Sequence, residues 1–197
     1  MAIIIAISGK KRSGKDTVAD YLCQKYNFVK QCFADPLKQA VAILFDWKLE
    51  DLYNENKDLK DDFWKIIRRK PLQTFGTELM RQNLQKYVPE LGWVKDNFWV
   101  LRWMKEYDRK NPERVVIPDA RFINEIELIR LKYPDEFFSI RINRNIQSND
   151  IHLSEISLDQ YDKFDFIIDN NSTFEHLFQQ VDNIMEQILK GGKNETN

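Results

Sequence analysis

The sequence predicts an α/β fold in which a largely parallel sheet is flanked by helices. Strand-like and helix-like patterns alternate along the chain, as expected where helices connect parallel strands. A short apolar run at the N-terminus leads directly into a glycine-containing loop. The chain of 197 residues, 43% of them hydrophobic, is long enough for one ordinary domain with a sizeable core.

The first strand is predicted over residues 2–8, which form a short, almost continuous apolar run. A helix is expected over residues 15–25, followed by a short strand over residues 28–34. Pro36 then begins a helix that extends to about residue 44, because proline suits the first helical turn.

Residues 47–70 differ from the rest because a charge run at 57–62 has few apolar anchors. One interpretation is a solvated helical face or loop. The other is a mobile flap over a substrate. Both can hold, because lids are drawn from weakly packed segments.

The alternation of strand-like and helix-like patterns resumes after residue 70. The pattern predicts helices over 71–87, 94–107 and 121–133, and strands over 113–119, 137–142 and 164–168.

The last helix has the clearest signals. Ser172-Thr173-Phe174-Glu175 matches a capping box, and Gly191-Gly192 ends the helix. We expect a single domain over residues 1–192 and a disordered tail over 193–197. The predicted buried stripe of this helix comprises Phe174, Leu177, Phe178, Val181, Ile184, Ile188 and Leu189.

Composition excludes several classes of protein. Charged residues make up 31% of the chain but nearly balance, with a net charge of −1, so we expect no nucleic-acid or membrane partner. Cys23 and Cys32 lie in no C-x-x-C pair and are predicted to be reduced thiols. With only His152 and His176 as histidines, and no cysteine nearby, a zinc site is not expected. The N-terminal apolar run is too short to span a bilayer, so a cytoplasmic protein is predicted.

The loop after the first strand has the pattern of a phosphate-binding loop. Its backbone N–H groups and the following helix N-terminus form a cradle for polyphosphate, and Lys15 can reach the outer phosphates. The usual pattern places Ser or Thr directly after the lysine to hold magnesium, whereas here Asp16 stands there and Thr17 follows. The predicted ATP-binding residues are Gly9, Lys10, Arg12, Ser13, Gly14, Lys15, Asp16 and Thr17.

A carboxylate ends the predicted strand 113–119. Asp119 would lie beside the phosphate loop, where it could bind Mg²⁺ directly or through water, or could instead cap a helix. Arg121 could clamp a substrate phosphate or form a surface salt bridge. The predicted metal ligands are Asp16, Thr17 and Asp119.

Cationic side chains are scattered along the sequence. A phosphoryl-transfer enzyme needs several fixed cations, although each of these alone would more often be a solvated surface charge. Arginine suits this role because its planar fork binds two oxygens. The candidates are Lys38, Arg68, Arg69, Arg81, Arg121, Arg141 and Arg144.

A polar segment at 148–155 has two interpretations. It could be a lid near the nucleotide, or an ordinary crossover loop in which His152 and Glu155 cap a helix.

Four stretches together resemble the deoxynucleoside monophosphate kinases of large tailed bacteriophages and related viruses. Animal phosphomevalonate kinases are similar at the phosphate loop, at Pro36-Leu37-Lys38 and at the Asp-x-Arg strand end. Residues 47–70 are short beside the long insertion of some phage members. The four stretches are Ser8–Thr17 with Ala19-Asp20, Leu72-Gln73-x-x-Gly76-Thr77-Glu78-Leu79 after Arg69, Ile117-Pro118-Asp119-x-Arg121, and Ser148-Asn149-Asp150-x-His152-x-x-Glu155.

The resemblance implies a P-loop NTPase fold with a helical monophosphate-binding region at 47–90 and a lid at 144–163. It implies transfer of the γ-phosphoryl group of ATP, with Mg²⁺, to a deoxynucleoside monophosphate, and it suggests a homodimer. A phosphomevalonate kinase-like enzyme and a non-catalytic nucleotide-binding regulatory module are the alternatives. The implied catalytic residues are Lys15, Asp16, Arg121 and Arg144, and the implied substrate-binding residues are Lys38, Arg69, Gln73, Thr77, Arg81, Asp119, Arg121, His152 and Glu155.

Overall fold

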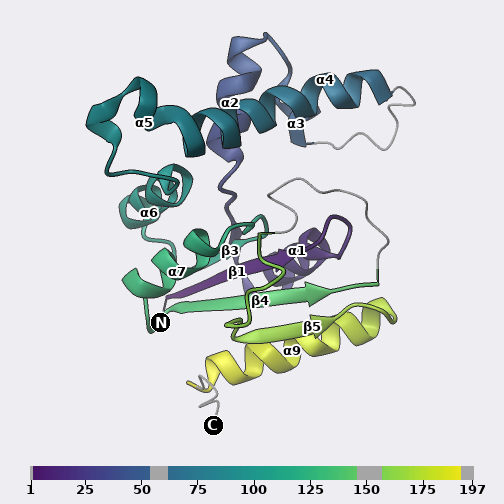
Figure 1. Cartoon of the computed structure of the whole chain (residues 1–197). Coiled ribbons are helices and arrows are strands. Elements are labelled where there is room, and N and C mark those ends of the chain that lie inside the picture. The colour runs from purple at the N-terminus through teal and green to yellow at the C-terminus, as the bar shows by residue number, and fades with distance from the viewer. Residues whose placement is uncertain (1, 54–61, 146–156, 192–197) are drawn as a thin grey trace. The chain divides into compact units, whose positions relative to one another are not determined.

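The computed structural model describes residues 2–53, 62–145 and 157–191 of the chain (Figure 1). Two compact units are found: Met1–Cys32 with Tyr107–Asn197, and Phe33–Glu106. The predicted tail at 193–197 and the central part of the predicted lid lie outside the described residues.

The first unit is built on a five-stranded sheet in which every strand pair is parallel, which confirms the predicted α/β class. The strand order is β2-β3-β1-β4-β5. The bounds are β1 Ile3–Gly9, β2 Val29–Lys30, β3 Arg114–Ile117, β4 Phe137–Asn143 and β5 Phe166–Asp169.

The register of the sheet determines which residues share an edge. β1 is central, with Ala6 opposite Ile117 of β3 and Gly9 opposite Ile142 of β4. The segments that follow β1, β3, β4 and β5 therefore leave the sheet at the same carboxyl edge, where α/β folds bind ligands.

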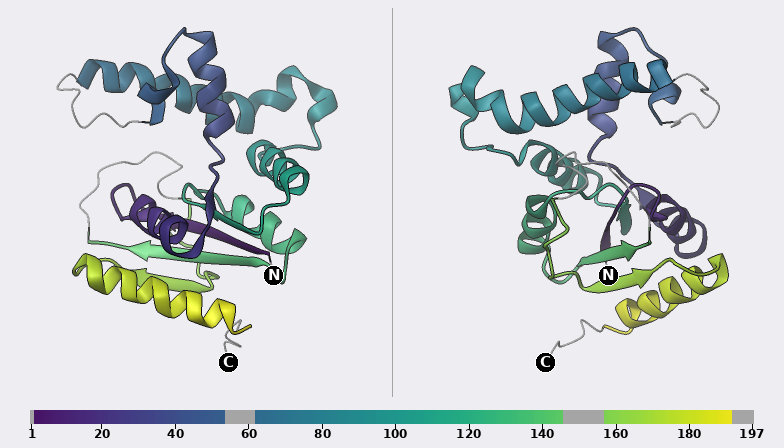
Figure 2. Two further views of the ribbon diagram at one scale, coloured as in Figure 1. Left: turned by 180° about the vertical axis from the view of Figure 1, so that it is seen from behind. Right: turned by 45° about the vertical axis from the view of Figure 1, so that its right-hand side comes forward.

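Helices cover both faces of this sheet. Alternate side chains of β1 pack with α1 (Lys15–Tyr26) and α9 (Phe174–Leu189) in one buried cluster. Figure 2 shows α9 running alongside β5. The opposite face is covered by α7 (Ile123–Lys132), whose Arg130 donates a hydrogen bond to Ser139 of β4.

The second unit is helical. Its elements are α2 Asp35–Leu44, α3 Leu49–Tyr53, α4 Asp62–Gln73, the π-helix η1 Thr74–Asn83, α5 Leu84–Tyr87, the 3₁₀ helix η2 Pro89–Leu91 and most of α6 Phe98–Lys110.

The prediction that a helix starts at Pro71 was wrong. The helix α4 begins at Asp62, and Pro71 lies inside it. Proline within a helix removes one backbone hydrogen bond and crowds the preceding turn, and a π-helical stretch is one way to absorb that disturbance. The π-helix η1 follows directly after α4.

Three smaller predictions were also wrong. The strand β2 has two residues rather than seven and lies at the edge of the sheet, paired with β3. The last helix is capped by Thr173, whose hydroxyl accepts from the His176 N–H at 3.3 Å, so the capping box on Ser172 and Glu175 does not form. The predicted buried stripe fails at its two ends.

At those ends, Phe174 is 64% exposed and Leu189 is 50% exposed.

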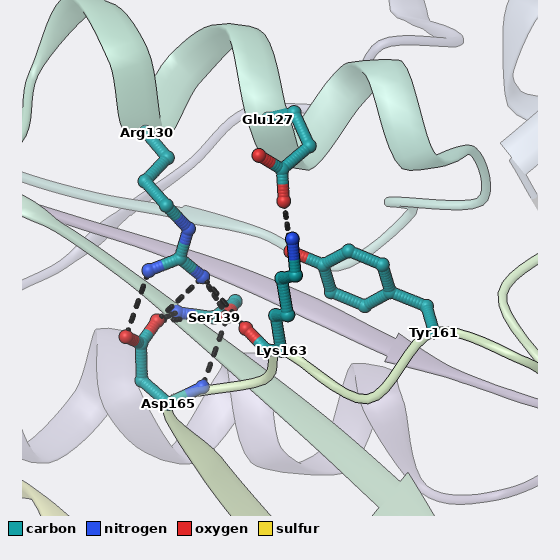
Figure 3. Close-up of polar contacts among 6 residues, drawn as sticks. All are labelled: Glu127, Arg130, Ser139, Tyr161, Lys163 and Asp165. Carbon is teal, nitrogen blue, oxygen red and sulfur yellow. Dashed lines mark hydrogen bonds and ion pairs between the residues drawn. The ribbon is translucent and has the colours of Figure 1, made fainter. Parts of the chain in front are cut away.

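A partly buried polar cluster holds the segment that leads into β5 (Figure 3). Arg130 of α7 donates from Nη1 to Asp165 Oδ1 at 2.8 Å, and the Ser139 backbone N–H donates to Asp165 Oδ2 at 2.7 Å. Arg130 Nη2 also donates to the Lys163 carbonyl at 3.0 Å. Burial alone would raise the pKa of Asp165, but the hydrogen bonds from Arg130 and Ser139 outweigh it and hold that pKa below its usual value.

We expect Asp165→Asn to destabilise the protein by about 2–3 kcal/mol at neutral pH, because Arg130 then loses its charged partner. The depressed pKa means that the stabilisation is present above the unfolded-state pKa of about 4 and is lost as pH falls through the folded-state value. Urea unfolding of both proteins across pH 3–7 measures this difference.

The matched control is Asp162→Asn, at an exposed carboxylate three residues earlier. Equal losses for the two variants, or a difference that does not shrink in acid, would contradict the role given to Asp165.

Candidate functional site

The phosphate loop has the geometry expected of an anion cradle. Gly14 is the N-cap of α1 with φ 101°, and no side chain caps the helix. The Ser13 N–H donates to the Lys10 carbonyl at 3.1 Å, which closes the loop on itself. The first turn of α1 therefore presents its N–H groups to whatever lies in front of the loop.

Asn170 fixes this loop to the sheet. Its Nδ2 donates to the Ser13 carbonyl at 2.8 Å, and its backbone N–H donates to the Asn143 carbonyl at 2.8 Å. A Cβ on Gly14 would lie 2.4 Å from Asn170 Nδ2, so the close approach depends on glycine. Asn170 belongs to a stretch that continues the family resemblance, but sequence analysis gave it no role in the site, although its place directly after the last strand, at the carboxyl edge, was a usable signal.

Lys15 is held inside the loop. Its Nζ donates to the carbonyls of Gly9 and Lys10, both at 2.7 Å, and the residue is only 8% exposed. Near it, the buried hydroxyl of Ser13 finds no hydrogen-bond partner among the described residues. A buried ammonium and an unpaired hydroxyl at one loop suit a site that binds oxygen-rich anions.

A pocket of about 530 Å³ opens between the beginnings of α1 and α9. This volume falls within the range typical of small-molecule sites. The pocket brings together six of the predicted residues with a second group, from the start of α9, that sequence analysis did not assign to the site. It is lined by Arg12, Gly14, Lys15, Asp16, Thr17, Arg144, Asn170, Ser172, Thr173, Phe174 and Glu175.

Two arginines contact the region of the phosphate loop: Arg141, which lies in β4, and Arg144, which directly follows it. Arg144 Nη1 donates to the Arg12 carbonyl at 3.2 Å. Arg141 donates to the Ser8 hydroxyl and to Asp159, each at 3.0 Å.

Asp159 also forms an ion pair with Lys10 of the loop. The segment from residue 157 onward, which follows the undescribed part of the predicted lid, is thereby tied to the phosphate loop. This role of Asp159 had no sequence signal.

The strand end after β3 lies at the same edge. Ile117, the last residue of β3, pairs with Ala6 of β1, and Asp119 follows two residues later. The N–H groups of Arg121 and Phe122 donate to Glu125 Oε2 at 2.7 Å and 3.0 Å. Glu125, only 2% exposed, thus caps the N-terminus of α7.

Asp16 and Thr17 offer oxygen ligands at the pocket. The Asp16 side chain is 83% exposed, and its carboxylate lies 4.0 Å from Lys30 Nζ. Magnesium is commonly held by one or two carboxylates together with phosphate oxygens and water, so this donor set fits it. Over the described ranges, no group of three or more His, Cys, Asp and Glu side chains could hold a metal.

Five predicted acceptor-binding residues belong to the helical unit. The Arg81 residue is 7% exposed, and its Nη1 donates to the Asp96 carbonyl at 3.1 Å. The ammonium of Lys38 lies 4.2 Å from the ring centroid of Tyr53. Arg69 is exposed, whereas Gln73 and Thr77 are half-buried.

The other cationic candidate in this unit, Arg68, is paired with Asp51 at 2.9 Å. The predicted substrate residues His152 and Glu155 lie outside the described residues. The acceptor-binding roles therefore remain predictions.

A parallel sheet, a phosphate loop after its central strand and a pocket with three cationic side chains define a nucleotide-binding protein of the P-loop class. The chain belongs to the deoxynucleotide monophosphate kinase family, whose model matches residues 3–64 and 46–181.

Two viral relatives support this assignment. The chain is 36% identical over 184 residues to a mimivirus protein (Acanthamoeba polyphaga mimivirus) named for deoxynucleotide monophosphate kinase activity, an alignment that covers 91% of this chain and 94% of that protein. It is 34% identical over 99 residues to the deoxynucleotide monophosphate kinase of Escherichia phage RB69, covering 45% of this chain and 41% of the relative. Among solved structures, dephospho-CoA kinase from Campylobacter jejuni aligns over 97% of this chain and 99% of that chain, at 17% identity and a TM-score of 0.44.

None of the helices in the described part of the chain combines the length and apolar character needed to cross a membrane.

We expect Gly14→Ala to weaken ADP binding and to cost about 1 kcal/mol more stability than Gly191→Ala. Both glycines have left-handed φ values, but only at Gly14 would a Cβ meet a neighbour, the Asn170 amide, whereas Gly191 has nothing within 4 Å. The additional loss of stability expected for Gly14→Ala corresponds to about one lost hydrogen bond. Chemical denaturation and calorimetric ADP titration measure the two effects.

A double-mutant cycle with Asn170→Ala identifies the contact. The cost of Gly14→Ala should shrink in the Asn170→Ala background, and strictly additive costs would rule out the coupling.

Proposed function

We propose that this protein transfers the γ-phosphoryl group of ATP to a deoxynucleoside monophosphate, giving ADP and the deoxynucleoside diphosphate. Membership of the deoxynucleotide monophosphate kinase family supports the acceptor class. The observation that carries the proposal is the buried Lys15 ammonium inside a phosphate loop that opens onto a cationic pocket.

The phosphoryl donor, ATP, is proposed to bind at the phosphate loop. The N–H groups of the loop and of the first turn of α1 would bind the phosphates, while Lys15 moves from the Gly9 and Lys10 carbonyls to the outer phosphate oxygens. Arg12 and Arg144 line the same pocket and would neutralise charge on the transferred group.

Magnesium is the proposed cofactor, held by Asp16 and Thr17 with Asp119 at the neighbouring strand end. When bound, it would offset the negative charge of the donor phosphates. Asp16 is exposed to the pocket, so its carboxylate can reach the metal directly or through water.

The acceptor phosphate is proposed to be held by arginines. Arg121 contributes from the end of β3, and Arg69 and Arg81 contribute from the helical unit. The further proposed acceptor contacts are Lys38, Gln73, Thr77, Asp119, His152 and Glu155. The acceptor oxygen is already anionic near neutral pH, so the reaction needs no strong general base, and catalysis rests on positioning and charge stabilisation. Exclusion of water would prevent hydrolysis of the donor.

A coupled ADP-release assay across the deoxynucleoside monophosphates tests the proposal. We expect rapid, acceptor-dependent ADP release with at least one of them and only slow release without an acceptor. Turnover with phosphomevalonate, but with no deoxynucleoside monophosphate, would identify a phosphomevalonate kinase-like enzyme instead. Slow hydrolysis that no acceptor accelerates would identify a nucleotide-binding regulatory module instead.

We expect Lys15→Ala to lower turnover by about 100- to 1,000-fold, because a preorganised charge-stabilising donor commonly contributes about 3–4 kcal/mol to the transition state. The measurement is kcat at saturating ATP, with a thermal melt to verify folding. Lys11→Ala, which removes a neighbouring charge of the same loop, serves as the control and should lower kcat by less than about tenfold. Near-normal turnover of a folded Lys15→Ala protein would remove the lysine from the mechanism.

Asp16→Asn should raise the magnesium concentration needed for half-maximal activity several-fold, since the amide is a weaker ligand for a hard cation. Asp20→Asn is the matched control, because Asp20 lies one turn later on α1 and also pairs with Lys30. A magnesium titration that is the same for both variants and the wild type would assign Asp16 to the helix N-terminus rather than to the metal.

A further inference from the structure

One aromatic side chain at the pocket is exposed in a way that its sequence pattern does not predict. Phe174 lines the pocket and is 64% exposed, although the helical periodicity of α9 assigns it to the buried stripe. A phenylalanine left in water beside a binding pocket is a contact surface that a planar ligand group can cover.

Phe174 is the outer member of a stacked series of rings. Its ring centroid lies 6.2 Å from that of Phe178, at an interplanar angle of 25°. Phe178 in turn stacks on Tyr21 of α1, at 4.1 Å and 9°. The side of Phe174 that faces its own helix is therefore supported by further rings.

Hydrogen bonds fix the inner end of this series. The Tyr21 hydroxyl donates to Asp182 at 3.0 Å, and Lys25 donates to the same carboxylate at 2.8 Å. Burial alone would raise the pKa of Asp182, but the hydrogen bonds from Lys25, Tyr26 and Tyr21 lower it, so the carboxylate stays charged and keeps its partners. The rings behind Phe174 are thus preorganised, which reduces the entropy lost when a ligand stacks on it.

Two polar side chains that line the pocket with Phe174 make hydrogen bonds within the protein. The Asn170 amide N–H donates to the Ser13 carbonyl, and the Thr173 hydroxyl accepts from the His176 N–H. These two contacts are made within the protein rather than to a ligand. A flat apolar surface recognises ring area rather than hydrogen-bonding pattern.

From this geometry we propose that Phe174 is the surface on which the base of the phosphoryl donor stacks, and that the donor is selected by the area of its base, purine over pyrimidine. The inference rests on the proposed function in placing the donor polyphosphate on the loop. The pocket connects that loop to Phe174, and its volume of about 530 Å³ can accommodate a nucleoside.

The test compares a ligand that has a base with one that has none. ADP and inorganic tripolyphosphate are titrated calorimetrically, with magnesium chloride, into the wild type, Phe174→Ala, Phe174→Trp and Leu189→Ala. We expect Phe174→Ala to weaken ADP binding about 5- to 150-fold, the range that one base–aromatic stack commonly contributes, and to leave tripolyphosphate within twofold of the wild type. Phe174→Trp should retain ADP affinity.

Leu189→Ala is the matched control, since Leu189 is a half-exposed apolar residue at the far end of the same helix. It should leave both titrations unchanged. Steady-state kinetics add a second readout: the wild type should have a lower KM for ATP than for UTP, and Phe174→Ala should bring the two values together with little change in kcat.

Two results would overturn the inference. Unchanged ADP affinity in Phe174→Ala would show that no base stacks there, and an equal loss for ADP and tripolyphosphate would show that Phe174 acts through the loop. These outcomes differ from failure of the proposed function, in which ADP binding depends on Phe174 yet no deoxynucleoside monophosphate is phosphorylated.

Discussion

The hydrogen bond from the Asn170 amide to the Ser13 carbonyl is the contact on which the rest of the site depends. It joins positions 157 residues apart and passes over the side of Gly14 where any other residue would carry a Cβ. Since the Asn170 backbone is itself bonded to Asn143, the phosphate loop is positioned by the ends of two strands. The start of α1, the placement of Lys15 and the adjoining pocket all follow from a loop held in this way.

The short strand β5 serves both stability and function. Asp165 lies directly before its first residue and is held by Arg130 and Ser139, whereas Asn170 lies directly after its last residue and holds the phosphate loop. Because the four residues of β5 are paired with β4, the distance between the two ends of the strand is nearly constant. The polar cluster at one end of β5 therefore helps to determine where the site at the other end lies.

The sequence was sufficient for the class of fold. The buried run of β1 and the glycine pattern after it are local signals, and they predicted the loop at whose pocket the structure places Lys15, Asp16 and Thr17. Contacts between distant segments could not be obtained in the same way. Asn170 and Asp159 act through partners more than 140 residues away, and no periodicity encodes such a pairing. The capping role of Glu125 could have been predicted, because a glutamate three residues after the N-cap is a known capping signal.

Phe174 illustrates a different limit of sequence analysis. Helical periodicity identifies the side of α9 that faces the core, but it does not show where the core ends. The first turn of this helix lines the pocket.

The cationic phosphate loop and the ring of Phe174 attract a nucleotide over different distances. Charges act over roughly 8–10 Å at physiological salt, whereas stacking requires contact. Nucleotides with different bases should thus associate at similar, salt-dependent rates and differ in how long they remain bound, so the choice of donor is made at dissociation.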